Sequence, residues 1–242
     1  MPNIKRPAIL GVKIASLALL ALSSLTSQAG VNPTQTRSPA SPRSIIRTEE
    51  DKPNLLLSAQ AKPLGISLAD AASLTAAFNT TDHCGEPPTL PMQMLYACGS
   101  GPQIFEVRQG TYFYAPILHV DDSQPVIGQF PEVSERTTLR NYIYSQAQVG
   151  VVYAVIEVDG WHYWLTPNYL VGLDVPPLPD GGGTRYATVA AFLKPLAVGT
   201  HTIEITALAT GKDLIPWCGI VSEILACKDA IEFTASYTVI VK

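Results

Sequence analysis

Apolar and polar side chains alternate along much of the chain after residue 103. Residues 200–208 and 231–241 alternate with a period of two, which is typical of strands with one buried and one solvent-facing side. Residues 184–193 are apolar on both sides and predict a central strand that protein covers on both faces. The Asp159-Gly160 pair between two apolar runs predicts a β-hairpin, because a type I′ turn needs positive φ at both central positions. These short strands predict a mainly-β fold, an antiparallel β-sandwich of immunoglobulin-like or jelly-roll type with one or two short helices.

Two segments have helical periodicity instead. Residues 67–78 begin with Ser67 and Asp70 at the spacing of a capping box, which marks a helix N-terminus. The side chains expected on the buried face of this helix are Leu68, Ala71, Leu74 and Phe78. Residues 134–148 also carry apolar side chains at helical spacing and predict a second helix. Two short strands are expected between these helices, on either side of Gln109 and Gly110.

Residues 190–207 could form part of a functional site or only support the fold. The segment joins the end of the fully apolar strand to an alternating strand through a turn that contains Pro195 and Gly199. Its first strand has no polar side, and its second exposes mainly Thr side chains and Glu204. We therefore expect a hairpin that serves as scaffold, with His201 at the edge of the core.

The N-terminal region predicts export. A basic stretch, an apolar run at residues 14–25 and small residues before Ala29 are the parts of a secretory signal peptide. The apolar run is shorter than the roughly 20 residues that span a bilayer. We expect residues 1–29 to be a signal peptide cleaved after Ala29, and the protein to be secreted or periplasmic. Residues 30–62 are rich in Pro, Ser and Thr and predict a disordered linker, which leaves residues 63–242 as a single β-sandwich domain with an N-terminal helix.

The charge balance excludes some partners. The chain has 16 basic and 20 acidic residues, a net charge of −4. Residues 1–29 contain three of the basic residues and no acidic one, so the mature chain would carry 13 against 20, a net charge of −7. Nucleic acids and anionic membrane surfaces are bound through basic patches, so neither is an expected partner. The partner stays unknown, and an extracellular glycan or an envelope component is compatible with this charge.

Four cysteines follow the predicted cleavage site: Cys84, Cys98, Cys218 and Cys227. An even number of cysteines in an exported chain predicts disulfides, and four cysteines allow three connectivities. We expect Cys84–Cys98 and Cys218–Cys227, because each of these pairs closes a short loop. A structural zinc site is disfavoured, since neither pair has the Cys-x-x-Cys spacing.

Five segments occur in a familiar order between residues 65 and 242: DHCG, TYFYAPIL, VIEVDG, LKPLAVGTHTIEI and SYTVIV. Their order resembles a family of uncharacterised exported bacterial β-sandwich proteins, in which a signal peptide precedes a Cys loop, a VDG hairpin and a closing PLxxGxHTI hairpin. The resemblance implies the fold and the exported location. It implies no activity, so no catalytic residue is carried over. The strand before LKPL departs from the family, because YATVAAF stands where Asp-Gly and an aromatic pair are usual.

A metal site is one candidate for chemistry. His119, Asp121 and Asp122 follow an apolar run, and Asp82 and His83 could join them from the first cysteine loop. Aspartate oxygens suit Ca²⁺, whereas a histidine favours zinc or another transition metal. The alternative is that the strand ends in a solvated loop whose aspartates cap backbone amides. A divalent cation is thus the single cofactor that the sequence suggests.

An aromatic group after the Asp-Gly turn is the stronger binding candidate. It consists of Trp161, Tyr163, Trp164 and Tyr169. On a strand, Trp161 and Tyr163 share one side, while His162 and Trp164 share the other. Exposed aromatic side chains with polar tips can stack on sugar rings. The alternative is that both sides are buried.

Motifs of the common hydrolases are missing from the sequence. It has no Gly-x-Ser-x-Gly elbow and no His-Glu-x-x-His helix, and its glycine-rich PDGGGTRY lacks the lysine of a phosphate loop. Glu132, Glu135, Glu157 and Glu204 show no recognisable pairing. We therefore assign no catalytic residue and expect a non-enzymatic binding or surface-associated module. The competing hypothesis is an extracellular hydrolase that acts on a polymer through an unrecognised carboxylate pair.

Overall fold

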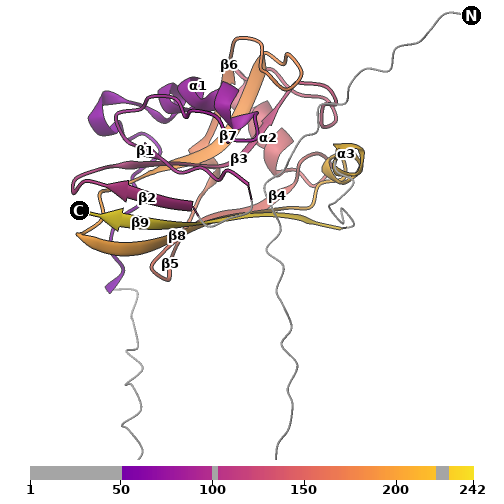
Figure 1. Cartoon of the computed structure of the whole chain (residues 1–242). Helices are drawn as coiled ribbons and strands as arrows, with labels where there is room; N and C mark the ends of the chain where they lie inside the picture. Colours follow the sequence, from indigo (N-terminus) through magenta and orange to yellow (C-terminus); the bar gives the residue numbers. More distant parts are fainter. Residues whose placement is uncertain (1–50, 100–102, 222–228) are drawn as a thin grey trace, which may run out of the picture.

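Two β-sheets lie face to face in the computed structural model, which describes residues 51–99, 103–221 and 229–242 (Figure 1). The four-stranded sheet has the order β1 (Gln93–Met94), β3 (Phe113–Asp121), β7 (Arg185–Leu193), β6 (Leu170–Asp174). The five-stranded sheet has the order β2 (Gln103–Val107), β9 (Ile231–Val241), β8 (Gly199–Ala209), β4 (Val151–Val158), β5 (Trp161–Trp164). Apolar side chains of both sheets form one core between them. The mainly-β sandwich that the alternating pattern predicts is confirmed.

One edge of each sheet departs from the expected antiparallel arrangement. β1 pairs in parallel with β3, and β2 pairs in parallel with β9, whereas all other pairs of named strands are antiparallel. Both sheets are therefore mixed. The parallel partners are not consecutive strands, and β2 and β9 are separated by more than 120 residues. Period-two patterning reports which side of a strand is buried and carries no information on such pairings.

Several connections pass from one sheet to the other, and two of them concern expected hairpins. β2 and β3, on either side of Gln109 and Gly110, belong to different sheets, and so do β7 and β8. Residues 190–207 are therefore a corner of the sandwich and not the expected hairpin. β7 is buried along nearly its whole length, and the inward side of β8 buries Ile203 and Ile205. Each strand fills the same core from its own sheet, which is what the two apolar patterns require.

Three α-helices occur in the described residues: α1 (Leu68–Asn79), α2 (Arg136–Tyr144) and α3 (Leu214–Val221). Two short 3₁₀ helices, η2 (Pro63–Gly65) and η3 (Pro167–Tyr169), complete the elements. Figure 1 shows α1 lying over the four-stranded sheet on the side away from the five-stranded sheet. The predicted capping box is confirmed, because the Ser67 hydroxyl accepts from the Asp70 amide and the Asp70 carboxylate accepts from the Ser67 amide.

The buried face of α1 differs from the predicted one. Leu74, expected to be buried, is 51% exposed. Small side chains face the sheet instead, and Ala72 and Ala76 pack against the fully buried ring of Tyr186. A helix that lies this close to a large aromatic ring has room for alanine but none for leucine. Helical spacing marked the helix correctly, and Leu68 and Ala71 are buried as expected, but the prediction is wrong for Leu74.

The ordered fold begins before the expected domain boundary at residue 62. Leu56 forms a bridge with Leu193 at the end of β7. The amide of Leu57 donates to the carbonyl of Phe192 at 3.0 Å, and the amide of Lys194 donates to the carbonyl of Leu55 at 2.8 Å. Residues 51–62 are thus part of the sandwich and correct the predicted linker. Three consecutive leucines at 55–57 were the signal of burial in an otherwise polar, proline-containing stretch.

The first predicted disulfide is present. Cys84 and Cys98 form a bridge with an S–S distance of 2.03 Å. Cys218 is fully buried in α3, but its predicted partner Cys227 lies outside the described residues. The predicted signal peptide and residues 30–50 of the linker also lie outside them. Within the described part of the chain, no helix has the length and apolar character needed to cross a membrane.

Candidate functional site

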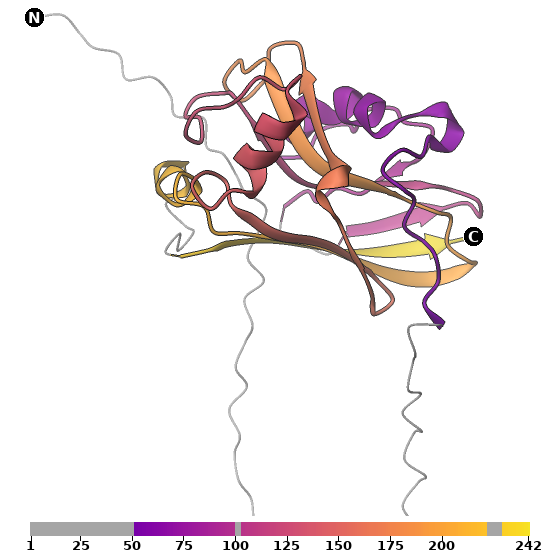
Figure 2. The same ribbon diagram turned by 180° about the vertical axis from the view of Figure 1, so that it is seen from behind.

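The aromatic group after the Asp-Gly turn splits between two roles. Asp159 (φ 51°) and Gly160 (φ 85°) form the predicted turn, and β5 follows directly. Tyr163 and Tyr169 point inward and are buried. Their hydroxyls donate to carbonyls of the chain's own N-terminal segment, Tyr163 to Pro53 at 2.6 Å and Tyr169 to Leu57 at 2.7 Å. Figure 2 shows this segment, in indigo, running along the side of the sandwich. Two of the four candidate ligand-binding aromatics therefore serve the fold.

Trp164 is the member of the group that faces solvent. Its side chain is 59% exposed, whereas Trp161 is half-buried and packs against the core. The rings of Tyr153 and Trp164 meet edge to face with centroids 5.6 Å apart. The ring of His162 stacks beside Trp164 at 6.4 Å. The predicted alternation along β5 is thus observed, with Trp161 and Tyr163 inward and His162 and Trp164 outward.

Cross-strand register extends this aromatic group into a strip on the outer side of the five-stranded sheet. We call it the outer strip, and its members are Tyr153, Glu157, His162, Trp164, Glu204, Glu232 and Ser236. Glu157 on β4 lies opposite His162 on β5 and opposite Glu204 on β8, while Glu204 lies opposite Ser236 on β9. One polar row therefore crosses four strands. Trp164 lies in the next row, opposite Val155, and Tyr153 lies one row beyond it.

Hydrogen bonds hold the polar groups of the outer strip in place. His162 Nε2 lies 3.0 Å from Glu157 Oε2, and the Ser236 hydroxyl donates to Glu204 Oε2 at 3.0 Å. The two carboxylates face each other across antiparallel strands, an arrangement of like charges that costs stability unless each has its own partner. His162 and Ser236 supply those partners. The remaining carboxylate oxygens are available to accept hydrogen bonds from hydroxyl groups of a ligand.

Tyr153 and Glu232 form the second contact of the strip. The Tyr153 hydroxyl donates to Glu232 Oε1 at 3.2 Å. Partial desolvation, together with this hydrogen bond and the negative charge of Glu232, raises the pKa of Tyr153. The hydroxyl therefore stays protonated over the physiological range. The contact fixes the Tyr153 ring, which in turn supports the edge of Trp164.

The candidate metal residues have other partners in the structure. Asp122 accepts the amides of Thr184 at 2.7 Å and Arg185 at 2.9 Å, and it forms an ion pair with Arg185 Nε at 2.8 Å. Burial opposes ionisation of Asp122, but these hydrogen bonds and the Arg185 charge lower its pKa. Asp121 accepts the Ser123 amide at 2.8 Å. Both aspartates thus act as loop caps.

The histidines of the metal hypothesis also have other partners. The ring of His119 stacks on Tyr186 with centroids 5.7 Å apart, and desolvation lowers the pKa of His119 to about 4. His83 Nε2 lies 2.9 Å from the Asn79 carbonyl, and Asp82 accepts the Cys84 amide at 3.1 Å. Across the described residues, no group of three His, Cys, Asp or Glu side chains is placed to hold a metal ion. The strand-end alternative describes these residues better.

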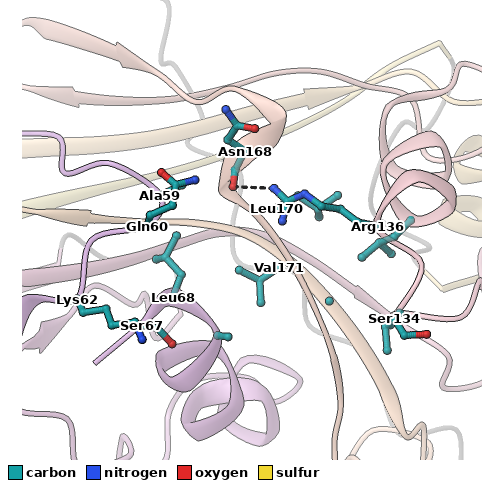
Figure 3. A pocket seen from close by; sticks show the side chains of 14 residues that line it. Ala59, Gln60, Lys62, Ser67, Leu68, Ser134, Arg136, Asn168, Leu170 and Val171 are labelled. Atoms are coloured by element: carbon teal, nitrogen blue, oxygen red, sulfur yellow. Dashed lines mark hydrogen bonds between the residues drawn. The ribbon is translucent and has the colours of Figure 1, made fainter. Parts of the chain in front are cut away.

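A separate pocket lies beside the four-stranded sheet (Figure 3). Its volume is about 560 Å³, and residues 59–62, the N-terminal ends of α1 and α2, η3 and β6 line it. Leu68, Leu139 and Leu170 contribute its buried apolar side chains. Lys62 and Arg136 are the charged residues of its lining, which contains no Asp, Glu, His or Cys. The pocket therefore offers hydrogen-bond donors and cations but no general acid or base of those types.

Sequence reasoning missed most of both sites. Glu157 and Glu204 were noted as carboxylates without a pairing, and the register of β4 on β8 supplies the pairing. Glu204 had been assigned to scaffold, yet it belongs to the outer strip. Lys62 and Arg136 carried no motif, because the pocket collects residues from five separate segments. The alternation of β5 was the single sequence signal that located part of a site.

Comparison of this chain with family models, with curated proteins and with solved structures finds no match in any of the three. Function is therefore inferred from the residues of the sites themselves.

Proposed function

We propose that this chain is an exported, non-enzymatic binding module whose outer strip binds an extracellular glycan. The observation that carries the proposal is the exposed ring of Trp164 beside a row of hydrogen-bonded carboxylates on an open sheet face. The signal-peptide pattern supports export, and so does the Cys84–Cys98 bridge, because disulfides persist in oxidising compartments. The resemblance to exported bacterial β-sandwich proteins points the same way.

The outer strip combines the two kinds of contact that a sugar ring needs. The apolar face of a pyranose can stack on the Trp164 ring, while its hydroxyls donate to Glu157 and Glu204. Hydrogen bonds to a charged acceptor are stronger than those between neutral groups. Neighbouring strands lie about 4.8 Å apart, so a row across four strands is roughly 14 Å long. That length accommodates a short oligosaccharide and not merely one sugar.

The charge of the strip narrows the class of glycan. Glu157, Glu204 and Glu232 are carboxylates, and His162 is the one basic side chain of the set. Uronic acids and sulfated sugars would meet like charges on this surface, which is unfavourable for association. A neutral polysaccharide, or one that carries amino sugars, is therefore the proposed ligand.

The test is binding of the purified protein to neutral glucans, xylans, mannans and amino-sugar polymers, measured by affinity electrophoresis and calorimetry. Trp164→Ala is expected to weaken binding at least tenfold, which corresponds to about 1.4 kcal/mol. Val198→Ala is the matched control, because Val198 is also an exposed apolar side chain (63%) but lies at the corner between β7 and β8. Equal binding by both variants would contradict the proposal.

The hydrolase hypothesis is retained as a second candidate because Glu157 and Glu204 lie directly opposite each other. Glycosidases use two carboxylates in such proximity. The same polysaccharides are incubated with the protein, and new reducing ends are counted. Binding without turnover supports the module. Turnover that Glu157→Gln or Glu204→Gln abolishes, while Trp164→Ala merely raises KM, would replace it with an enzyme.

A further inference from the structure

The pocket beside the four-stranded sheet has an apolar floor. Leu68 and Leu139 come from the two helices, and Leu170 comes from the edge strand β6. All three are at most 3% exposed, so the floor is part of the packed core and is already formed. α2 lies close against β6 at Gly172, where an added Cβ would stand 2.3 Å from Leu139 Cδ2. The helix and the strand thus hold the floor rigidly.

Cationic and polar side chains surround this floor, as Figure 3 shows for the labelled residues. One N–H of Arg136 donates to the Asn168 carbonyl at 3.2 Å, which orients the guanidinium along the rim. A guanidinium has five N–H donors, so this bond uses part of its capacity. Lys62 lies on the α1 side of the pocket near Asp70, whose carboxylate is already bonded to Ser67. The lining holds two cations and no carboxylate, although acidic residues outnumber basic ones in the chain.

We infer that this pocket binds a small amphipathic carboxylate, with its hydrocarbon body on the apolar lining and its carboxylate at Arg136. Arginine is suited to the anionic group because its planar fork pairs with both carboxylate oxygens. The pocket volume lies within the range of about 300–1,000 Å³ that is usual for small-molecule sites. A sugar is disfavoured here, since the lining has no aromatic side chain for a ring to stack on.

The inference is independent of the proposed glycan site, because the pocket belongs to the helix-covered side of the four-stranded sheet and the outer strip to the five-stranded sheet. Three probes separate the contribution of the anionic group to binding from that of the alkyl chain. Octanoate has both the anionic group and the alkyl chain, 1-octanol has the chain alone, and acetate has the charge alone. Each is titrated into the purified protein while leucine methyl resonances are followed by NMR.

Octanoate is expected to bind saturably and to shift the methyl resonances of Leu68, Leu139 and Leu170. Acetate and 1-octanol should each bind at least tenfold more weakly. Arg136→Gln should weaken octanoate binding about tenfold, and Arg140→Gln should leave it unchanged. Arg140 is the matched control, because it is also an exposed arginine of α2 but lies outside the pocket lining. Unfolding temperatures of both variants verify that the fold is intact.

Three results would overturn the inference. The first is binding of 1-octanol as tightly as octanoate, which would leave an apolar groove without anion recognition. The second is an Arg136→Gln variant that binds octanoate as the unmodified protein does. The third is an unliganded dimer in sedimentation that Arg136→Gln converts to a monomer, since a second copy of the chain would then occupy the pocket.

Discussion

The outer faces of the two sheets differ in what lies over them, and the central strand β7 is buried on both sides whereas β8 and β9 alternate. On the four-stranded sheet, the outward side of β7 is covered by α1, and the ring of Tyr186 there is fully buried. On the five-stranded sheet, the outward side of β5 has no such helix in the described structure, and Trp164 is 59% exposed. The comparison shows that an outward-pointing aromatic side chain joins the core where a helix covers it and is available to a ligand where no helix does.

Polar groups on the two faces also have different partners. Under α1, the Asn79 side-chain amide donates to the Tyr186 hydroxyl at 2.9 Å and to Thr75 at 3.2 Å, so these groups satisfy one another. On the open face, Glu157 pairs with His162 and Glu204 accepts from Ser236, and both carboxylates remain accessible at the surface. Buried polar groups must be satisfied within the protein, whereas exposed ones can exchange water for a ligand.

The largest expected effect contrasts these two aromatic residues directly. Tyr186→Ala should lower the free energy of unfolding by about 3–5 kcal/mol, because it removes a buried ring and leaves a cavity under α1. Trp164→Ala should lower it by less than about 1 kcal/mol, since more than half of this residue is already in water. Urea unfolding followed by circular dichroism measures both. Similar losses in the two variants would mean that the open face is covered in solution, which would break the comparison.

The covered face was partly predictable from the sequence. The apolar run at 184–193 predicted a doubly covered strand, and β7 is one. The Ser67–Asp70 capping box located the start of the covering helix. The orientation of that helix was not predictable from large apolar residues, because its contact with Tyr186 depends on small ones. Pairings between distant strands, such as β2 with β9, also escape local patterns, since register and partner are set by the whole fold.

The open face was predictable in one strand only. Alternation along β5 separated Trp164 from Tyr163 correctly. The partners of Tyr163 and Tyr169 could not be anticipated, because they are backbone carbonyls of Pro53 and Leu57, more than a hundred residues away. The residues of the outer strip are brought together by the registers of β4 with β5 and of β4 with β8. The spacing of residues within a single strand does not predict these registers.

The second-largest effect is expected from the disulfide that follows the covering helix α1. The Cys84–Cys98 bridge, with a sequence separation of 14, joins the connection between α1 and β1 to the connection between β1 and β2. Closing a loop of this length is expected to stabilise the protein by about 3 kcal/mol in the chain-entropy model. The double variant Cys84→Ser/Cys98→Ser should therefore unfold at lower urea concentration. Binding at the outer strip, measured on the folded variant, should not change; a loss of binding would show that the two faces are coupled.

Histidines on the two sides give the smallest effects, with opposite signs. Desolvation against Tyr186 lowers the pKa of His119 to about 4, with Asp121 raising it and His83 lowering it further. Partial burial opposes protonation of His201, but bonds to the Asp159 carboxylate at 2.7 Å and the Ala197 carbonyl at 2.9 Å raise its pKa. His201 lies on β8, on the same side as the buried Ile203, and contacts the turn between β4 and β5 through Asp159.

The sign of each pH dependence follows from these directions. An unfolded histidine binds a proton near pH 6.5, but folded His119 resists protonation until about pH 4. Its contribution is present above pH 6.5 and is lost on acidification, by about 2 kcal/mol between pH 7 and pH 5. His119→Gln should remove this part of the loss.

The contribution of His201 to stability has the opposite pH dependence. It is complete below pH 6.5 and is lost as the pH rises through the raised pKa of the folded state. That loss should be about 0.5 kcal/mol, because the Asp159–His201 pair is partly solvated. His201→Gln should flatten the stability curve above pH 7 and leave the acid side unchanged. Urea unfolding at half-unit pH intervals separates the two variants. An acid loss that persists in His119→Gln would place the covered histidine in water, and the two faces would then differ less than the structure indicates.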